Sequence, residues 1–150
     1  MIDPKELMID NYVMVGDDVM SVRGVEATTD TYIHVISTDA WAGEDYPSTQ
    51  EVQPISLSAQ VLGACGFNKW SRDGQIAWHI DAFAQGREVA RHDIDLISGN
   101  IYLKSRYDTE CLTYQRMPHI KHLHQMQNLY FSLTGQPLEI DLQKLKNALQ

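Results

Sequence analysis

Several motifs that would identify a known chemistry are missing from this sequence. It contains no GxSxG nucleophile motif, no phosphate-binding loop, no GxGxxG fingerprint and no HExxH zinc helix. Its two cysteines, Cys65 and Cys111, lie far apart and lack ligand-like spacing, which indicates two buried thiols in a reducing compartment. These absences favour a binding protein over an enzyme, and we expect no cofactor.

Long apolar runs are missing as well. No stretch approaches the roughly 18 residues that a membrane-spanning helix needs. The first residues, MIDPKELMID, carry acids and a proline where a signal peptide has basic residues followed by an apolar segment. We therefore expect a cytoplasmic protein with no membrane partner.

Basic residues are scarce in the first part of the chain. Residues 1–60 hold eleven acidic residues against two basic ones, whereas residues 61–150 hold nine acidic and ten basic residues. An acidic surface repels a phosphate backbone, so we expect no binding to duplex nucleic acid. The nearly neutral second part remains suited to a small anion in a local basic pocket.

The remaining composition is that of one globular domain, with 43% hydrophobic and 21% charged residues in a chain of 150. Residues 1–56 form an acidic part rich in short β-type runs. Residues 57–150 combine a short helix, further strand-like runs, a helix at 120–134 and a final helix after Asp141. The pattern predicts an α+β fold, mainly antiparallel β, with a short middle helix and C-terminal helices packed on the sheet.

The helix predicted at 120–134 carries the most distinctive stretch, HIKHLHQMQNLYFSLTG. On a helix, His122 and His124 project to different sides, so they cannot bind one metal ion together, and we expect no metal site here. Gln127 falls in the apolar sector of the helix. Either its amide satisfies backbone groups of an adjoining strand, or His124, Gln127 and Asn128 line a polar pocket.

The segment LHQMQNLYFSLTG resembles HQLQNLYFALTG, the C-terminal signature of small uncharacterised phage and prophage proteins of Bacteroidetes-type bacteria. MIDNYVMV at 8–15 and PISLSAQVLGACGFNKW at 54–70 are similar to further segments of that family. His119 and His122 lie outside the signature. The resemblance implies an SH3-like, barrel-like part at the start of the chain and a phage context, and it carries no established activity.

Two further patterns contain metal-ligating residue types. His79 and Asp81 share one face of a predicted strand, and His92 or His124 would complete the two-histidine, one-carboxylate set of an iron site. Asp93 and Asp95 likewise share a face, where they would bind a divalent cation or form an acid/base pair. The alternative for both patterns is the solvated face of a half-buried strand.

A third pattern suits a phosphorylated ligand. Lys104 and Arg106 share a strand face near Tyr102 and Tyr114, and cationic groups beside aromatic rings are suited to nucleotides. The alternative is ordinary surface charge. Trp41, in the polar loop at 37–50, is a further candidate contact.

Taken together, the sequence predicts a non-enzymatic protein that sequesters a small nucleotide-type signal of host defence in a phage-infected bacterium. The expected ligand contacts are His124, Gln127, Asn128, Lys104, Arg106 and Trp41. One alternative is a protein-interaction module that blocks a host defence protein. Another is a metal-dependent enzyme with His79 and Asp81 as ligands. A homo-oligomer is compatible with each of these hypotheses.

Overall fold

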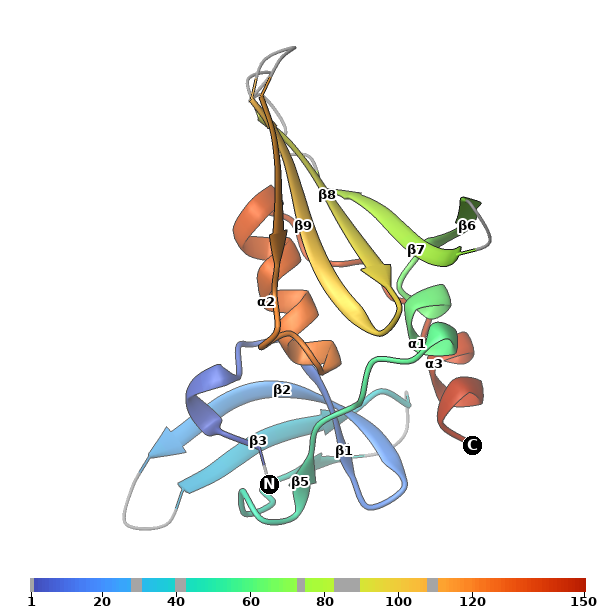
Figure 1. Ribbon diagram of the computed structural model, residues 1–150. Helices are drawn as coiled ribbons and strands as arrows, with labels where there is room; N and C mark the ends of the chain where they lie inside the picture. Colours follow the sequence, from blue (N-terminus) through green and yellow to red (C-terminus); the bar gives the residue numbers. More distant parts are fainter. Residues whose placement is uncertain (1, 28–30, 40–42, 73–74, 83–89, 108–110) are drawn as a thin grey trace. The chain divides into compact units, whose positions relative to one another are not determined.

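Figure 1 shows the computed structural model of the chain, which describes residues 2–27, 31–39, 43–72, 75–82, 90–107 and 111–150. The elements in chain order are η1 (Pro4–Glu6), β1 (Tyr12–Val15), β2 (Asp18–Ala27), β3 (Thr31–Ser37), β4 (Glu44–Asp45), β5 (Val52–Gln53), α1 (Ala59–Ala64), β6 (Asn68–Arg72), β7 (Gln75–Ala82), β8 (Ala90–Ile97), β9 (Asn100–Tyr107), β10 (Cys111–Arg116), α2 (Leu123–Thr134) and α3 (Leu142–Leu149). The fold is α+β with two antiparallel sheets, a short middle helix and C-terminal helices, which confirms the expected class. None of the described helices is long and apolar enough to span a membrane.

The chain divides into two compact units. The first contains residues 1–57 together with residues 122–128, and the second contains residues 58–121 and 129–150. The sequence predicted a change from the acidic β-rich part to the α+β part between residues 56 and 57, one residue before the boundary between the two units. Helix α2 begins three residues later than the predicted position 120 and supplies its first half to the first unit.

The first unit is built on the sheet β4-β3-β2-β1-β5. β1 and β2 pair antiparallel as a hairpin across a two-residue turn of Gly16 and Asp17. A register shift between Val22 and Gly24 marks a bulge in β2, and bulges increase the local bend and twist of a strand. The bulge lies in the longest strand of this sheet, and the SH3-like character expected at this end stays a prediction. The core of the first unit is apolar, formed by Ile2, Leu7, Val13, Met20, Val22, Ile33, Val35 and Val52.

The second unit is built on the sheet β10-β9-β8-β7-β6. Ser98 and Gly99 join β8 to β9, and both have positive φ, of 50° and 77°. Two consecutive positive φ values are typical of a type I′ turn, whose twist matches that of the flanking strands. The turn holds Ile97 opposite Asn100 and thereby sets the register of the hairpin.

Helices α1 and α3 pack against each other in the second unit. The Ser58 side chain accepts a hydrogen bond from the Val61 N–H at the start of α1, and Gly66 follows the end of the helix with φ of 77°. Asp141 caps α3 through the Lys144 N–H, at 3.1 Å. Cys65 is buried beside α1, and burial raises the pKa of its thiol to about 12, so it is an inert packing residue.

Replacing Leu145 should destabilise the second unit strongly, because its side chain is fully buried in α3. Leu145→Ala should lower the free energy of unfolding by about 2–5 kcal/mol through lost burial and a residual cavity. The matched control is Leu149→Ala in the same helix, where the side chain is 36% exposed and the cost should stay below about 1 kcal/mol. Urea titration followed by circular dichroism measures both. Equal losses would contradict the assigned packing of α3.

Candidate functional site

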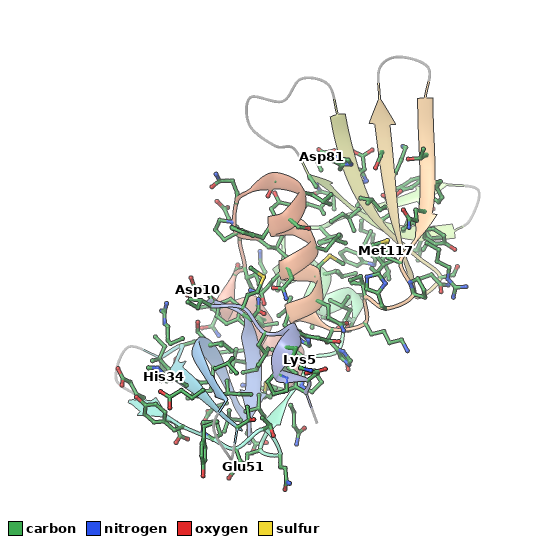
Figure 2. The ribbon with its side chains drawn as sticks, turned by 90° about the vertical axis from the view of Figure 1, so that its left-hand side faces the viewer. Lys5, Asp10, His34, Glu51, Asp81 and Met117 are labelled. Atoms are coloured by element: carbon green, nitrogen blue, oxygen red, sulfur yellow. The ribbon has the colours of Figure 1, made fainter. Side chains whose placement is uncertain are left out.

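Four chemically active side chains lie together on one face of the second sheet. His79 and Asp81 come from β7, and Asp93 and Asp95 come from β8. The register pairs His79 with Asp95 and Asp81 with Asp93, and directly paired residues project to the same face. The two patterns that the sequence shows separately therefore form one group, which we call the His–Asp cluster. Figure 2 labels Asp81, the member of the His–Asp cluster that lies near the end of β7.

His79 is held by a carboxylate at each ring nitrogen. Nδ1 lies 2.6 Å from Asp95 Oδ1, and Nε2 lies 3.1 Å from Asp81 Oδ1. Carboxylates only accept hydrogen bonds, so an imidazole that makes both bonds is doubly protonated. Burial by itself lowers the pKa of His79, but the hydrogen bonds to Asp95 and Asp81 outweigh burial and the net shift is upward.

Asp95 is the buried member of the cluster, with 5% of its side chain exposed, whereas 60% of Asp81 is exposed. Besides His79, it accepts a 3.3 Å hydrogen bond from the Tyr114 hydroxyl. Burial raises the pKa of Tyr114, and the nearby Asp95 carboxylate adds to the shift, so the phenol keeps the proton that it donates. Asp95 thus orients both the imidazole and the phenol.

The aromatic and basic candidates lie on the same face, on β9 and β10. Tyr102 and Tyr114 stack with ring centroids 5.1 Å apart and planes inclined by 23°. Lys104 is paired with Asp93 on one side and with Tyr114 on the other, and its ammonium group lies 3.7 Å from Asp93 Oδ2. Arg116, paired with Tyr102, donates a hydrogen bond to Asn100.

The opposite face of this sheet is directed into the second unit. It buries Ile94 and Ile101, and Trp78 lies close to Gly63 of α1. His92 is on this side, paired with Ala82, and its Nδ1 lies 2.8 Å from Ser105 Oγ. The alternation of a strand therefore excludes His92 as the third ligand beside His79, and the sheet supplies Asp93 instead.

Two of the expected ligand contacts cannot be placed in this way. Trp41 lies outside the described residues. Arg106 is paired through its backbone with Arg91 and Leu112 in β8 and β10, and its side chain is not among those described. Of the two basic candidates in β9, the geometry described here is therefore that of Lys104.

The other three expected contacts, all in α2, hold the N-terminal segment within the first unit. Gln127 accepts a 2.9 Å hydrogen bond from the Tyr12 N–H and donates a 3.1 Å bond to the Asp10 carbonyl. Asn128 accepts from the Asn11 side chain and donates to the Glu6 carbonyl. The partners lie in β1 and in the residues just before it. This is the first of the two alternatives for Gln127, in which its amide satisfies backbone groups of an adjoining strand. Figure 2 labels Lys5 and Asp10, two residues of the segment that precedes β1.

His124 is fully buried in the first unit. Its Nε2 lies 3.3 Å from Glu6 Oε2, while Nδ1 has no hydrogen-bond partner among the described residues. Burial lowers the pKa of His124 and outweighs the opposing influence of Glu6, so the folded protein favours the neutral ring. His122 precedes α2, and its ring stacks on that of His124 at 5.7 Å between centroids. The predicted separation of these rings assumed a helix already formed at His122.

Two contacts were missed in the sequence. Asp95 binds His79 and Tyr114, and Asn11 binds Asn128. The alternation in HDIDL and the tight turn at Ser98–Gly99 carry enough information to place Asp95 on the face of Tyr102. No signal within either segment joins Asn11 to Asn128, which lies 117 residues away.

Comparison of the chain with protein-family models, with curated proteins and with solved structures finds no match. The candidate site therefore rests on its own geometry.

Gln127→Leu should destabilise the first unit by about 1–3 kcal/mol, because the substitution leaves the Tyr12 N–H and the Asp10 carbonyl without their partner. Gln143→Leu, on an exposed position of α3, is the matched control and should change stability by about 0.5 kcal/mol or less. Urea titration compares the two variants. A Gln127→Leu variant as stable as the control would show that the amide does not hold the segment.

The lowered pKa of His124 makes the first unit sensitive to acid. Below the ordinary histidine pKa of 6.5 the unfolded chain binds a proton that the folded chain resists, so stability is present above this pH and is lost as pH falls. The wild type should lose more unfolding free energy between about pH 7.5 and about pH 5.5 than His124→Gln does. His119→Gln, at an exposed histidine, should behave like the wild type. Identical losses in the wild type and in His124→Gln would contradict the shift.

Proposed function

We propose that this chain is a binding protein for a small nucleotide-type ligand, which it holds on the polar face of the sheet β6–β10. The observation that carries the proposal is the stacked pair Tyr102 and Tyr114 with basic residues paired to both rings. Aromatic faces accept bases of any sequence by stacking, at about 1–3 kcal/mol per base. Cationic side chains next to them accept phosphate oxygens.

The carboxylates described on this face are concentrated on one pair of strands, which supports one orientation of such a ligand. Asp81, Asp93 and Asp95 lie on β7 and β8, whereas Lys104 and Arg116 lie on β9 and β10. A phosphate group is attracted to the β9–β10 side and repelled from the β7–β8 side. The base would stack on Tyr114, which is 50% exposed, and the phosphate would lie toward Arg116.

The biological setting of the proposal comes from the resemblance of the C-terminal segment to phage and prophage proteins. A protein that removes a nucleotide signal from solution interferes with any pathway that the signal activates. We therefore propose that the chain acts in a phage-infected bacterium and counters host defence by sequestering such a signal. This function requires binding without turnover, so it needs no catalytic residue.

Calorimetric titration with a panel of cyclic and ADP-ribose-type nucleotides tests the proposal. At least one compound should bind at micromolar concentrations, and Tyr114→Ala should weaken its binding about tenfold or more, because a stacking surface is lost. The matched control is Tyr46→Ala, which removes a tyrosine of nearly equal exposure, 51%, from the first unit and should leave the affinity unchanged. Absence of binding across the panel, or equal effects of the two substitutions, would refute the proposal.

A further inference from the structure

We propose that His79, Asp81 and Asp93 form a binding site for a first-row divalent metal ion such as Mn²⁺. Each of the three residues offers one ligand atom, and these atoms all lie within 4.8 Å of one another. The inference concerns the same face of the sheet as the proposed function, but it does not depend on nucleotide binding.

The distances fit a common metal ion. Two ligand atoms at about 2.1 Å from one cation are about 3.0–3.4 Å apart when they occupy neighbouring positions of octahedral or tetrahedral coordination. His79 Nε2 and Asp81 Oδ1 are 3.1 Å apart. A carboxylate oxygen of Asp93 lies within 4.8 Å of both atoms, so it must move closer to them to share one ion.

His79 has a carboxylate partner, Asp95, of the type that metal-binding histidines usually have. Ligating imidazoles usually donate their second N–H to a carboxylate, which fixes the tautomer and the ring orientation. The buried Asp95 carboxylate does this at Nδ1, at 2.6 Å. Nε2 faces Asp81, and a bound metal ion would displace the proton that Nε2 donates there, because a ligating nitrogen must be deprotonated. Asp95 is accordingly a positioning residue for the site, and it is itself held by the Tyr114 hydroxyl.

Two carboxylates beside the His79 imidazole attract a cation to this position. Asp81 and Asp93 are directly paired across β7 and β8, and like charges in such a pair destabilise a sheet. Lys104, on β9, offsets part of this charge through its ammonium group, 3.7 Å from Asp93 Oδ2. A divalent ion between Asp81 and Asp93 replaces their repulsion by two attractive contacts.

The donor set indicates the class of metal. Imidazole nitrogen is suited to first-row transition metals, and carboxylate oxygen is suited to Mg²⁺, Ca²⁺ and Mn²⁺. One imidazole with two carboxylates therefore favours Mn²⁺, Fe²⁺ or Zn²⁺ over the all-oxygen cations. Because 60% of the Asp81 side chain is exposed, water or a phosphate oxygen has access to the remaining coordination positions.

The test uses Mn²⁺ alone, added to the full chain after treatment with a chelator and its removal. Electron paramagnetic resonance of free Mn²⁺ should show saturable binding of one ion per chain. Asp81→Asn, at the most exposed ligand, should weaken binding about tenfold or more with the fold unchanged by circular dichroism. Asp45→Asn, an exposed aspartate of β4 in the first unit, is the matched control and should bind as the wild type does.

A second measurement separates a defined site from diffuse attraction to an acidic surface. Bound Mn²⁺ should broaden the imidazole resonances of His79 selectively and leave those of His34, in the first unit, sharp. Binding should persist at about 0.5 M NaCl, where interactions between exposed charges are largely screened. His79→Gln should weaken Mn²⁺ binding about tenfold or more, measured by the same electron paramagnetic resonance titration.

The inference is overturned if binding is not saturable, if about 0.5 M NaCl removes it, or if Asp81→Asn and Asp45→Asn bind Mn²⁺ equally well. Binding of Mn²⁺ with no nucleotide bound in its presence or absence supports the metal site and removes the proposed function. Binding of a nucleotide to a chain that takes up no Mn²⁺ supports the proposed function and removes the metal site. The two proposals therefore fail separately.

Discussion

The strand register of the second sheet is the constraint on which the candidate site depends. The Ser98–Gly99 turn sets β9 against β8, and the pairing of β7 with β8 brings His79 opposite Asp95. Side chains alternate between the two faces of a sheet, so a slip of one residue would bury the carboxylates and expose Ile94. The buried side chains of Ile94 in β8 and Ile101 in β9 resist that slip, because it would remove them from the core. Packing on one face thus orders the polar groups on the other.

Helix α2 shows how polar residues in an apolar context can be structural. Its amides bond to the segment that leads into β1 and to the first residue of that strand, at Glu6 and at Asp10 to Tyr12. Backbone groups that leave a sheet need other partners once they are buried, and Asn and Gln can donate and accept at the same time. The conspicuous residues of the C-terminal stretch are therefore explained by hydrogen bonding within the first unit, and this gives Gln127 and Asn128 a role that requires no ligand.

Much of the local structure was predictable from short-range patterns. The caps at Ser58 and Asp141 and the turns that contain Gly16 and Gly99 follow from the conformations that these residues prefer. The start of α2 was less predictable. His122 forms an isolated bridge with Ser56 before the helix begins, and such a contact depends on a strand far away in the sequence. The separate pairs His79–Asp81 and Asp93–Asp95 were visible as alternating residues. The pairing of β7 with β8 places His92, one of the two histidines expected to complete the first pair, on the other face of the sheet.

The sequence by itself determined the class of fold, the acidic character of the first part and which side chains share a face within each strand. These properties depend on composition and on neighbours within a few residues. Only the tertiary structure decided that His79, Asp81, Asp93 and Asp95 belong to one cluster, that His92 lies on the other face, and that Gln127 binds Tyr12. The physical reason is that pairing between strands, and between a helix and a distant segment, is selected by the burial of the whole core. No single segment contains that information.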